Sequence, residues 1–439
     1  MNTVILLILI IFICIFDYII FNKSFISTPF IFTFPFILAL CDGLIYYRQW
    51  QFNLSQKTSI LILAGILAVT FGSLFALPRY RIAVSDPTDL KRFHFKNSVY
   101  ILFAFITIVC TLITIFYERK LVSSYGYACG SIQDIIGSYN ELSKFGSTDV
   151  NLRGIGAYAY EITFSIGLLF SYLTARDISI AHRRFSRSCM FVYVLAAICV
   201  LTVGSRSVSI TLLLSFVFLL LFFLQNSGQL RGIGSIKINT LLIVGIIVSI
   251  VPFVFLRSLA LMGRETGSAS STLLYDFSIY LGAPLKNLDI AMNNGIPRSE
   301  MIGEWTFNNL YDTLKKIGFQ GPEYSTDFGF QSINRWFLGN VYTIFYYLSK
   351  DYGCVGCCIA LFVLGFLMQL VQSYCIKRFD DNKISVLTVM YGYFMYNVFF
   401  SFFADMTFQI LFSTIFLKKL LLVGVFSYIL NRRMKFDER

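Results

Sequence analysis

Residues 4–21 read V-I-L-L-I-L-I-I-F-I-C-I-F-D-Y-I-I-F, and this run decides the fold. It holds a single charged residue, Asp17, and its length matches the roughly 20 apolar residues that cross the hydrocarbon core of a bilayer. It has neither the basic lead-in nor the small-residue cleavage site of a secretory signal, so we expect an anchor rather than a removable signal peptide. Comparable runs recur along the 439 residues. The sequence therefore predicts a chain that crosses the membrane many times.

The overall composition points the same way. The chain is 56% hydrophobic and 14% charged, whereas soluble proteins carry about 25% charged residues. The formal net charge of +12 comes from Lys and Arg scattered between the apolar runs, as in loops that hold a membrane protein on its cytoplasmic side. These proportions exclude secreted, cytosolic and nucleic-acid-binding proteins. We predict an all-α fold, a polytopic helical bundle surrounded by the lipid bilayer, with no nucleic acid as partner.

Hydropathy predicts about 11 transmembrane helices. We expect them at residues 4–21, 29–47, 58–77, 98–117, 154–175, 188–204, 207–224, 239–257, 353–375, 385–403 and 407–429. The last of these runs is ambiguous, because Lys418 and Lys419 fall in its middle and each Lys costs about 2.5–3.5 kcal/mol on insertion scales. Either that helix is short and ends there, or the pair faces the protein interior.

Basic residues in the short connections predict the orientation. With the C-terminus inside, the inner loops hold 19 Lys and Arg and the short outer loops hold 7, so the positive-inside rule places the N-terminus outside and the C-terminus inside. Three regions follow: helices 1–8 over residues 1–257, an outer segment over 258–352, and helices 9–11 with a short tail over 353–439. Apolar residues at helical spacing near 273–288 and 305–317 predict amphipathic helices in the outer segment.

Motifs for nucleotide or metal chemistry are missing from the sequence. There is no G-x-x-x-x-G-K-[ST] loop, the two His fall in predicted inner loops, and no Asp-x-Asp pair occurs. We therefore expect no metal and no cofactor. What the outer side offers is Arg: Arg206 in the turn T-V-G-S-R-S at 202–207, Arg257 and Arg264 where the outer segment begins, and Arg335 near its end.

These Arg side chains are candidates for holding a pyrophosphate group, because guanidinium makes paired hydrogen bonds with phosphate oxygens and stays charged. The alternative is that an Arg at a helix end simply reaches the lipid head groups. Four further residues are candidates, and each also has a simpler structural interpretation. Glu265 and Asp351 are either bases or solvated surface acids. Trp336 and Tyr342 are either sugar-stacking rings or anchors at the membrane interface. Glu161 lies inside a predicted span and either lines a wet cavity or pairs with a neighbouring Arg.

Three stretches together resemble oligosaccharide repeat-unit polymerases, the O-antigen polymerase (Wzy-type) family. They are the turn at 202–207, the outer segment that opens with Arg and closes on G-N-V-Y-T at 339–343, and the helix start D-Y-G-C-V-G at 351–356. The recognisable motifs cover about residues 200–265 and 335–357, and the likeness in organisation covers the whole chain.

The resemblance implies a glycosyltransferase of the bacterial inner membrane, with its N-terminus periplasmic and its C-terminus cytoplasmic. It would join oligosaccharide repeat units carried on undecaprenyl pyrophosphate at the periplasmic face. Arg206 with Arg257 or Arg264 would bind the two pyrophosphates, with Glu265 beside them as a catalytic candidate. Arg335, Trp336, Tyr342, Asp351 and Glu161 would contact the substrate.

Other functions stay open at this point. The resemblance leaves room for a chain-length regulator protein as a further partner, besides the undecaprenyl-pyrophosphate-linked oligosaccharide. A flippase or transporter for a lipid-linked oligosaccharide predicts two related halves, and the sequence shows no such repeat. A surface-glycan ligase is expected to carry a His in its large outer loop, and this one has none. A membrane scaffold or receptor without chemistry is the third class.

Overall fold

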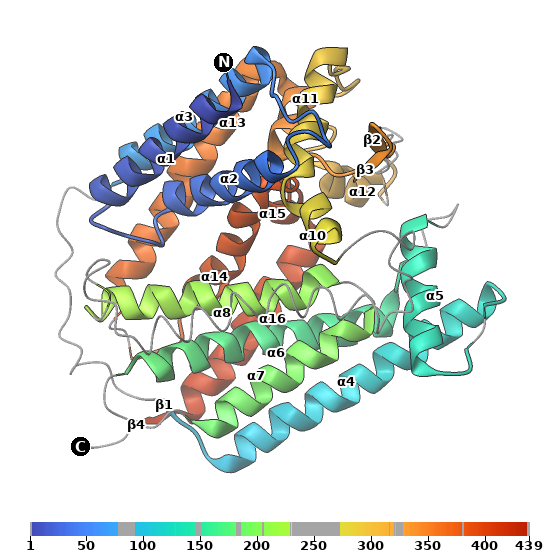
Figure 1. Cartoon of the computed structure of the whole chain (residues 1–439). Coiled ribbons are helices and arrows are strands. Elements are labelled where there is room, and N and C mark those ends of the chain that lie inside the picture. The colour runs from blue at the N-terminus through green and yellow to red at the C-terminus, as the bar shows by residue number, and fades with distance from the viewer. Residues whose placement is uncertain are drawn as a thin grey trace. The chain divides into compact units, whose positions relative to one another are not determined.

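The computed structural model of the chain is built almost entirely of helices (Figure 1). It describes residues 2–77, 93–127, 129–145, 151–180, 186–203, 206–228, 230, 273–315, 317–319, 321, 328–379 and 382–436. Within those ranges the strands form two short antiparallel ladders, one pairing β1 (Phe93–His94) with β4 (Lys435–Phe436) and one pairing β2 (Gln331–Ile333) with β3 (Trp336–Gly339). The all-α prediction is confirmed at this level.

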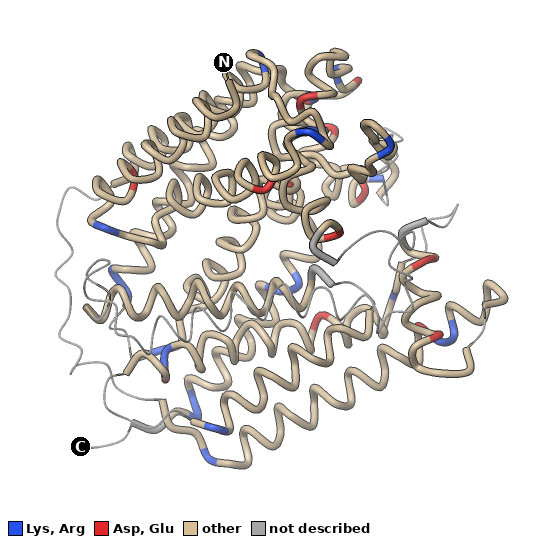
Figure 2. The backbone as a smooth tube through the Cα atoms, in the orientation of Figure 1, with Lys and Arg blue, Asp and Glu red and all other residues tan. Residues whose placement is uncertain are grey.

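Among the described residues, seven helices are long and apolar enough to cross a membrane, so the protein is a multi-span helical membrane protein. These helices are α1 (Thr3–Ile20), α2 (Thr28–Ile45), α3 (Gln56–Phe75), α4 (Asn97–Ser124), α8 (Arg206–Asn226), α13 (Ile344–Lys377) and α16 (Thr414–Arg433). Figure 2 shows their long uncharged stretches, with most of the coloured charged positions near helix ends and connections.

The other four predicted spans have different outcomes. The run at 154–175 forms α6 (Gly154–Ser179), which is not among the seven. Two form shorter apolar helices: α7 (Arg187–Cys199), continued by the 3-10 helix η2 (Val200–Val203), and α14 (Val386–Phe399), continued by η4 (Phe400–Phe402). The run at 239–257 lies outside the described residues.

The chain divides into two compact units. Unit 1 comprises Met1–Ile82, Thr272–Lys377 and Phe394–Phe416. Unit 2 comprises Ala83–Ser271, Arg378–Tyr393 and Leu417–Arg439. The chain passes from one unit to the other within α14 and α16, and the organisation into three regions stays a prediction.

In unit 1, α3 and α13 cross at very short range. A Cβ atom added at Gly72 would meet the Phe362 carbonyl oxygen, and one added at Gly365 would meet the Val69 carbonyl oxygen. Ser73 Oγ donates a hydrogen bond to the Gly365 carbonyl at 3.1 Å. Small residues allow such close approach between membrane helices, where van der Waals contact replaces the hydrophobic driving force.

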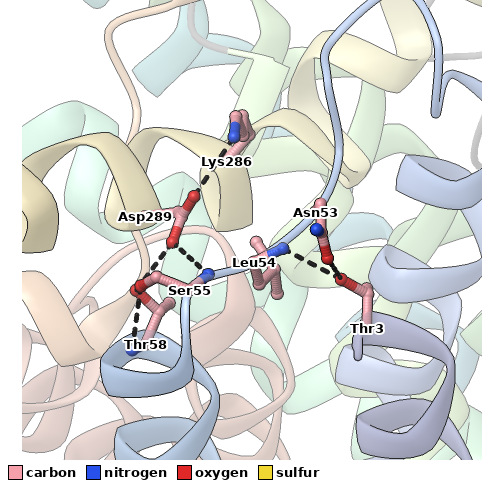
Figure 3. A network of polar contacts seen from close by, with 7 residues as sticks. All are labelled: Thr3, Asn53, Leu54, Ser55, Thr58, Lys286 and Asp289. Carbon is pink, nitrogen blue, oxygen red and sulfur yellow. Dashed lines mark hydrogen bonds and ion pairs between the residues drawn. The ribbon is translucent and has the colours of Figure 1, made fainter. Parts of the chain in front are cut away.

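Residues 273–339 of unit 1, within the segment predicted to lie outside, form α10 (Leu273–Leu281), α11 (Ala283–Asn294), α12 (Asn308–Lys315) and the β2–β3 hairpin. Asp289 fastens α11 to the start of α3 (Figure 3). It accepts hydrogen bonds from the Ser55 amide at 2.8 Å and Thr58 Oγ1 at 2.9 Å, and its second oxygen pairs with Lys286 Nζ at 3.1 Å. Helices thus occur in both stretches predicted to be amphipathic.

Unit 2 is organised around α6, which contacts α4, α7 and α8. Residues 163–176 of α6 are all buried, so this helix is covered by protein along most of its length. A helix covered by its neighbours can carry polar side chains that lipid would exclude. The short helix α5 (Ile132–Phe145) packs against the C-terminal part of α4, where Val122, Tyr139 and Leu142 form a small core.

Candidate functional site

Arg335 stands at the tip of the β2–β3 hairpin in unit 1. Asn334 and Arg335 both have positive φ, 49° and 68°, as in the two-residue type I′ turn whose twist matches its strands. The Arg335 side chain is exposed. The ring of Trp336 lies 5.1 Å from that of Tyr275 and keeps 39% of its surface exposed. The hairpin therefore presents a cation and an accessible indole next to each other.

Tyr342 belongs to an aromatic cluster made of Trp305, Phe328, Tyr342, Tyr346 and Tyr347. Its ring stacks on Tyr346 with 4.4 Å between centroids and meets Phe328 edge-on at 5.7 Å. Only 4% of Tyr342 is exposed. The Lys350 ammonium lies 4.3 Å from the Trp305 ring centre, a cation–π contact. The Tyr342 ring is thus covered by protein, and a sugar would reach it only if the cluster opened.

Asp351 acts as an acceptor for the loop that precedes α12. Its Oδ1 accepts from Ser299 Oγ at 2.7 Å, and its Oδ2 accepts from the Thr306 amide at 2.7 Å and from Thr306 Oγ1 at 2.6 Å. The Trp305 amide is 3.1 Å from both oxygens. Hydrogen bonds to an ionised acceptor are short and strong. The carboxylate therefore holds residues 299–306 against the start of α13.

Glu161 lies in unit 2 beside the unexpected lysines of the last span. Lys419 Nζ is 3.3 Å from Glu161 Oε2, and both side chains are at least nine-tenths buried. The Lys419 ammonium also lies 4.5 Å from the Phe164 ring and 5.6 Å from the Tyr393 ring. Of the two roles predicted for Glu161, the structure shows an ion pair, but the partner is a lysine and not the predicted arginine.

The same geometry answers the question raised by the lysine pair. Helix α16 is continuous from Thr414 to Arg433, so Lys418 and Lys419 lie in its first two turns and do not end it. Lys419 faces the interior of unit 2, whereas Lys418 lies 4.7 Å from the ring of the half-exposed Tyr158. Of the two readings left open, the interior one is correct for Lys419.

Glu118 is a second buried acid of unit 2. It is 0% exposed, and neither of its carboxylate oxygens has a hydrogen-bond partner among the residues that the structure describes. The buried Tyr160 hydroxyl also lacks one, and it interacts electrostatically with Glu118, Glu161 and Tyr393. Burying an unpaired carboxylate in a membrane is costly. We therefore treat Glu118, Tyr160, Glu161, Tyr393 and Lys419 together as the charged cluster of unit 2.

Helix α8 begins at Arg206, three residues after η2 ends at Val203. Val203 of η2 packs against the small core formed by Val122, Tyr139 and Leu142. Tyr139 in turn interacts electrostatically with Tyr160 of the charged cluster. Val203, at the end of η2, therefore packs on a core of unit 2 whose Tyr139 interacts with the charged cluster.

The predicted site residues divide between the two units. Trp336, Tyr342, Asp351 and the exposed Arg335 lie in unit 1, and Glu161 and the backbone of Arg206 lie in unit 2. Arg257, Arg264 and Glu265 lie outside the described residues. The assignment of these residues to catalysis or substrate binding stays a prediction, as does the expectation that the protein needs no metal or cofactor.

Sequence reasoning missed Glu118. The expected span ended at residue 117, because Glu118, Arg119 and Lys120 look like the start of a loop. Helix α4 instead continues to Ser124 and carries Glu118 into the protein interior. The usable signal was spacing: Glu118 falls three and four residues after Ile115 and Thr114, on the helix face that also holds buried Cys110 and Thr107.

Comparisons with known proteins add no relative to this picture. No family model, no curated protein and no solved structure matches the chain. What the fold establishes is a multi-span helical membrane protein with charged groups buried inside its helical bundle.

Proposed function

We propose that this protein is a membrane glycosyltransferase that joins oligosaccharide repeat units carried on undecaprenyl pyrophosphate, at the periplasmic face of a bacterial inner membrane. The acceptor hydroxyl attacks the anomeric carbon of the donor glycan as the carbon–oxygen bond to pyrophosphate breaks. The glycosidic bond forms, the proton leaves to a base, and the carrier pyrophosphate departs with its charge. Arg206, with Arg257 or Arg264, binds and stabilises that charge.

The observation that supports this proposal best is that helix α8 of unit 2 begins at Arg206. A helix start favours negative charge, because its first amides are unpaired and the helix dipole is positive there. Lys419 of the same unit is already neutralised by Glu161 at 3.3 Å. A lipid-linked pyrophosphate would therefore find its counter-charge in Arg206 and the amides of α8.

A second support is the structured outer segment of unit 1. Its helices, hairpin and loop are fastened by Asp289 and Asp351 rather than left as a linker, and long ordered connections are usually functional. The hairpin carries Arg335 beside the partly exposed Trp336, a pairing suited to a sugar ring with a nearby anionic group. We assign Arg335, Trp336, Tyr342 and Asp351 to this substrate-contacting surface, with Asp351 and Tyr342 acting as its supports.

The test uses cells whose surface glycan depends on this protein. We expect Arg206→Ala to leave single repeat units on the carrier at the outer leaflet, and purified protein in nanodiscs to bind polyprenyl pyrophosphate about 10–100-fold more weakly, because a charge-assisted hydrogen bond is lost. Arg206→Lys should recover binding only in part, since Lys cannot make the paired contact. Lys57→Ala removes an exposed cation and should change neither measurement.

The proposal fails if glycan length is unchanged in a chain that carries both Arg206→Ala and Arg264→Ala. A flippase or transporter for the same lipid-linked oligosaccharide is the second candidate, and Glu118 favours it. Transporters use buried membrane carboxylates to exchange protons. If Arg206→Ala or Glu118→Gln traps repeat units on the inner leaflet, the transporter assignment replaces the polymerase. Ligase activity would instead leave repeat units polymerised but not transferred to their surface acceptor.

A further inference from the structure

Two helices of unit 1 are interrupted, and each interruption carries an acid. Helix α13 has non-helical dihedrals at Gly353, with φ 71° and ψ 177°, two residues after Asp351. Between η4 and α15 (Thr407–Leu411), residues 404–406 have no regular structure, and the middle one is Asp405. Interrupted helices place unpaired backbone groups inside a membrane protein, and in transporters such places bind ions and substrates.

The two acids interact, but their hydrogen bonding differs. Asp405 is 0% exposed, and Asp351 contributes electrostatically to its environment. Asp405 Oδ1 accepts from the Phe408 amide at 3.2 Å, whereas Oδ2 is buried and has no hydrogen-bond partner in the described part of the chain. The Asp351 oxygens are already occupied by donors from residues 299–306. Asp405 thus has one oxygen free to hold a proton.

The groups facing Asp405 favour the neutral carboxyl. The titratable groups that interact with it are Asp351, Tyr347, Tyr352 and Cys357, all on α13. None of these is a cation, and the ammonium of Lys350 is engaged with the Trp305 ring. Among the described residues, the buried hydroxyl of Thr407 also lacks a hydrogen-bond partner, so a carboxyl proton has a neutral acceptor in the same region of unit 1.

The pKa of Asp405 is raised to about 8, chiefly because burial disfavours its charged form; the Phe408 amide lowers it and the nearby Asp351 raises it, and both effects are included in that value. Asp405 lies in the connection between helices and outside the seven membrane-spanning segments. A carboxyl whose folded pKa exceeds its unfolded value of about 3.9 stabilises the fold when protonated. That stabilisation is complete below the unfolded pKa and is lost as the pH rises through about 8.

Both interruptions also contact the same outer loop. Asp351 holds residues 299–306, and Asn309 Nδ2 donates to the Gln409 carbonyl of α15 at 2.9 Å. Gln409 Nε2 donates to the Trp305 carbonyl at 3.4 Å. A negative charge on Asp405 would repel the Asp351 carboxylate that clamps this loop. The charge on Asp405 therefore bears on how firmly the outer loop is held.

We infer that Asp405 is a proton-binding site of unit 1, formed where the interruptions of α13 and of the η4–α15 connection meet. The carboxylate takes up one proton from water and becomes a neutral carboxyl, and no other bond forms or breaks. Uptake holds the loop at 299–309 on α13 and α15, and release loosens it. This inference is independent of the proposed glycosyltransferase function.

The test is an infrared pH titration of the full chain in nanodiscs between pH 6 and 10, read with hydrogen exchange of residues 299–309. We expect a protonated-carboxyl band that disappears with a midpoint near pH 8, and exchange of the loop that quickens at least threefold over the same range. Asp405→Asn should remove that band and make loop exchange independent of pH. Asp312→Asn changes an acid that is 51% exposed and should leave both measurements as they are.

Asp405→Glu provides the check on folding, because it keeps a carboxyl at the same place. It should retain the band with a shifted midpoint. The inference is overturned if the Asp405→Asn protein keeps the full titration near pH 8. It is also overturned if exchanging K⁺ for Na⁺ at constant ionic strength moves the midpoint, because the site would then bind Na⁺ rather than only a proton.

Discussion

Asp351 in unit 1 and Glu118 in unit 2 are both acids of long membrane helices, yet their surroundings are opposite. Asp351 receives hydrogen bonds from Ser299, Trp305 and Thr306, whereas Glu118 is fully buried and receives none. Glu161 is intermediate, with one lysine as its partner. The difference teaches that an acid's position in a helix does not determine how many hydrogen bonds its oxygens receive.

The largest expected effect comes from breaking the Glu161–Lys419 pair. Lys419→Met leaves Glu161 buried without a counter-charge, and we expect a loss of about 3–5 kcal/mol in the free energy of unfolding. The double variant Glu161→Gln with Lys419→Met removes both charges and should recover most of that loss. Unfolding in a mixed detergent series measures both. Equal destabilisation by the single and double variants would show that the ion pair is not what holds α6 and α16 together.

Asp351→Asn should have the next largest effect and should act locally. The amide keeps the size of the side chain but loses the charge that its donors need, so we expect a loss of about 1.5–3 kcal/mol. Hydrogen exchange should quicken in residues 299–306 and stay unchanged in unit 2. Asp312→Asn on α12 is the matched control, since its 51% exposed carboxylate contributes about 0–1 kcal/mol. Uniform loosening of both units would contradict a clamp.

Glu118→Gln should have the smallest effect on stability, below about 1 kcal/mol in either direction. Glutamine matches glutamate in size and shape, so the packing around residue 118 is kept. Function should respond far more than stability, with glycan assembly or export reduced at least tenfold if the charged cluster works on the substrate. A Glu118→Gln protein that unfolds much more easily and retains full function would place Glu118 among the structural acids.

Hydropathy predicted about 11 membrane helices, and seven of them are long and apolar enough to span a membrane in the described residues. Such helices are recognisable in a sequence because a lipid-spanning segment must satisfy every backbone group within itself and is therefore a long apolar run. Hydropathy placed the start of the ninth span at residue 353, and α13 (Ile344–Lys377) has non-helical dihedrals at Gly353, so two helical pieces meet there. The shorter piece before Gly353 was not predicted, because Lys350, Asp351 and Gly353 look like a loop end and the hydrogen bonds that Asp351 accepts come from residues far away in the sequence.

The candidate site was harder to predict, since its features depend on distant partners. Tyr342 looked like an accessible aromatic, and only packing against Phe328 and Tyr346 hides it. Trp336 beside Arg335 kept its predicted accessibility because the two-residue turn carries the hairpin outward. Glu161 was recognised as costly, but its lysine partner lies 258 residues away in the sequence, beyond any local pattern.

The backbone-to-backbone crossing at Gly72 and Gly365 has a mechanical consequence. Backbone carbonyl oxygens lie where a side chain would otherwise separate the two helices. Helices α3 and α13 therefore move as one rigid pair, with a kink in α13 at Gly353. Asp289 joins α11 to the start of α3, and Asp351 joins residues 299–306 to the part of α13 that precedes Gly353. Bending at Gly353 would therefore change the distance between the contacts made by Asp289 and Asp351, and would displace the residues that lie between them.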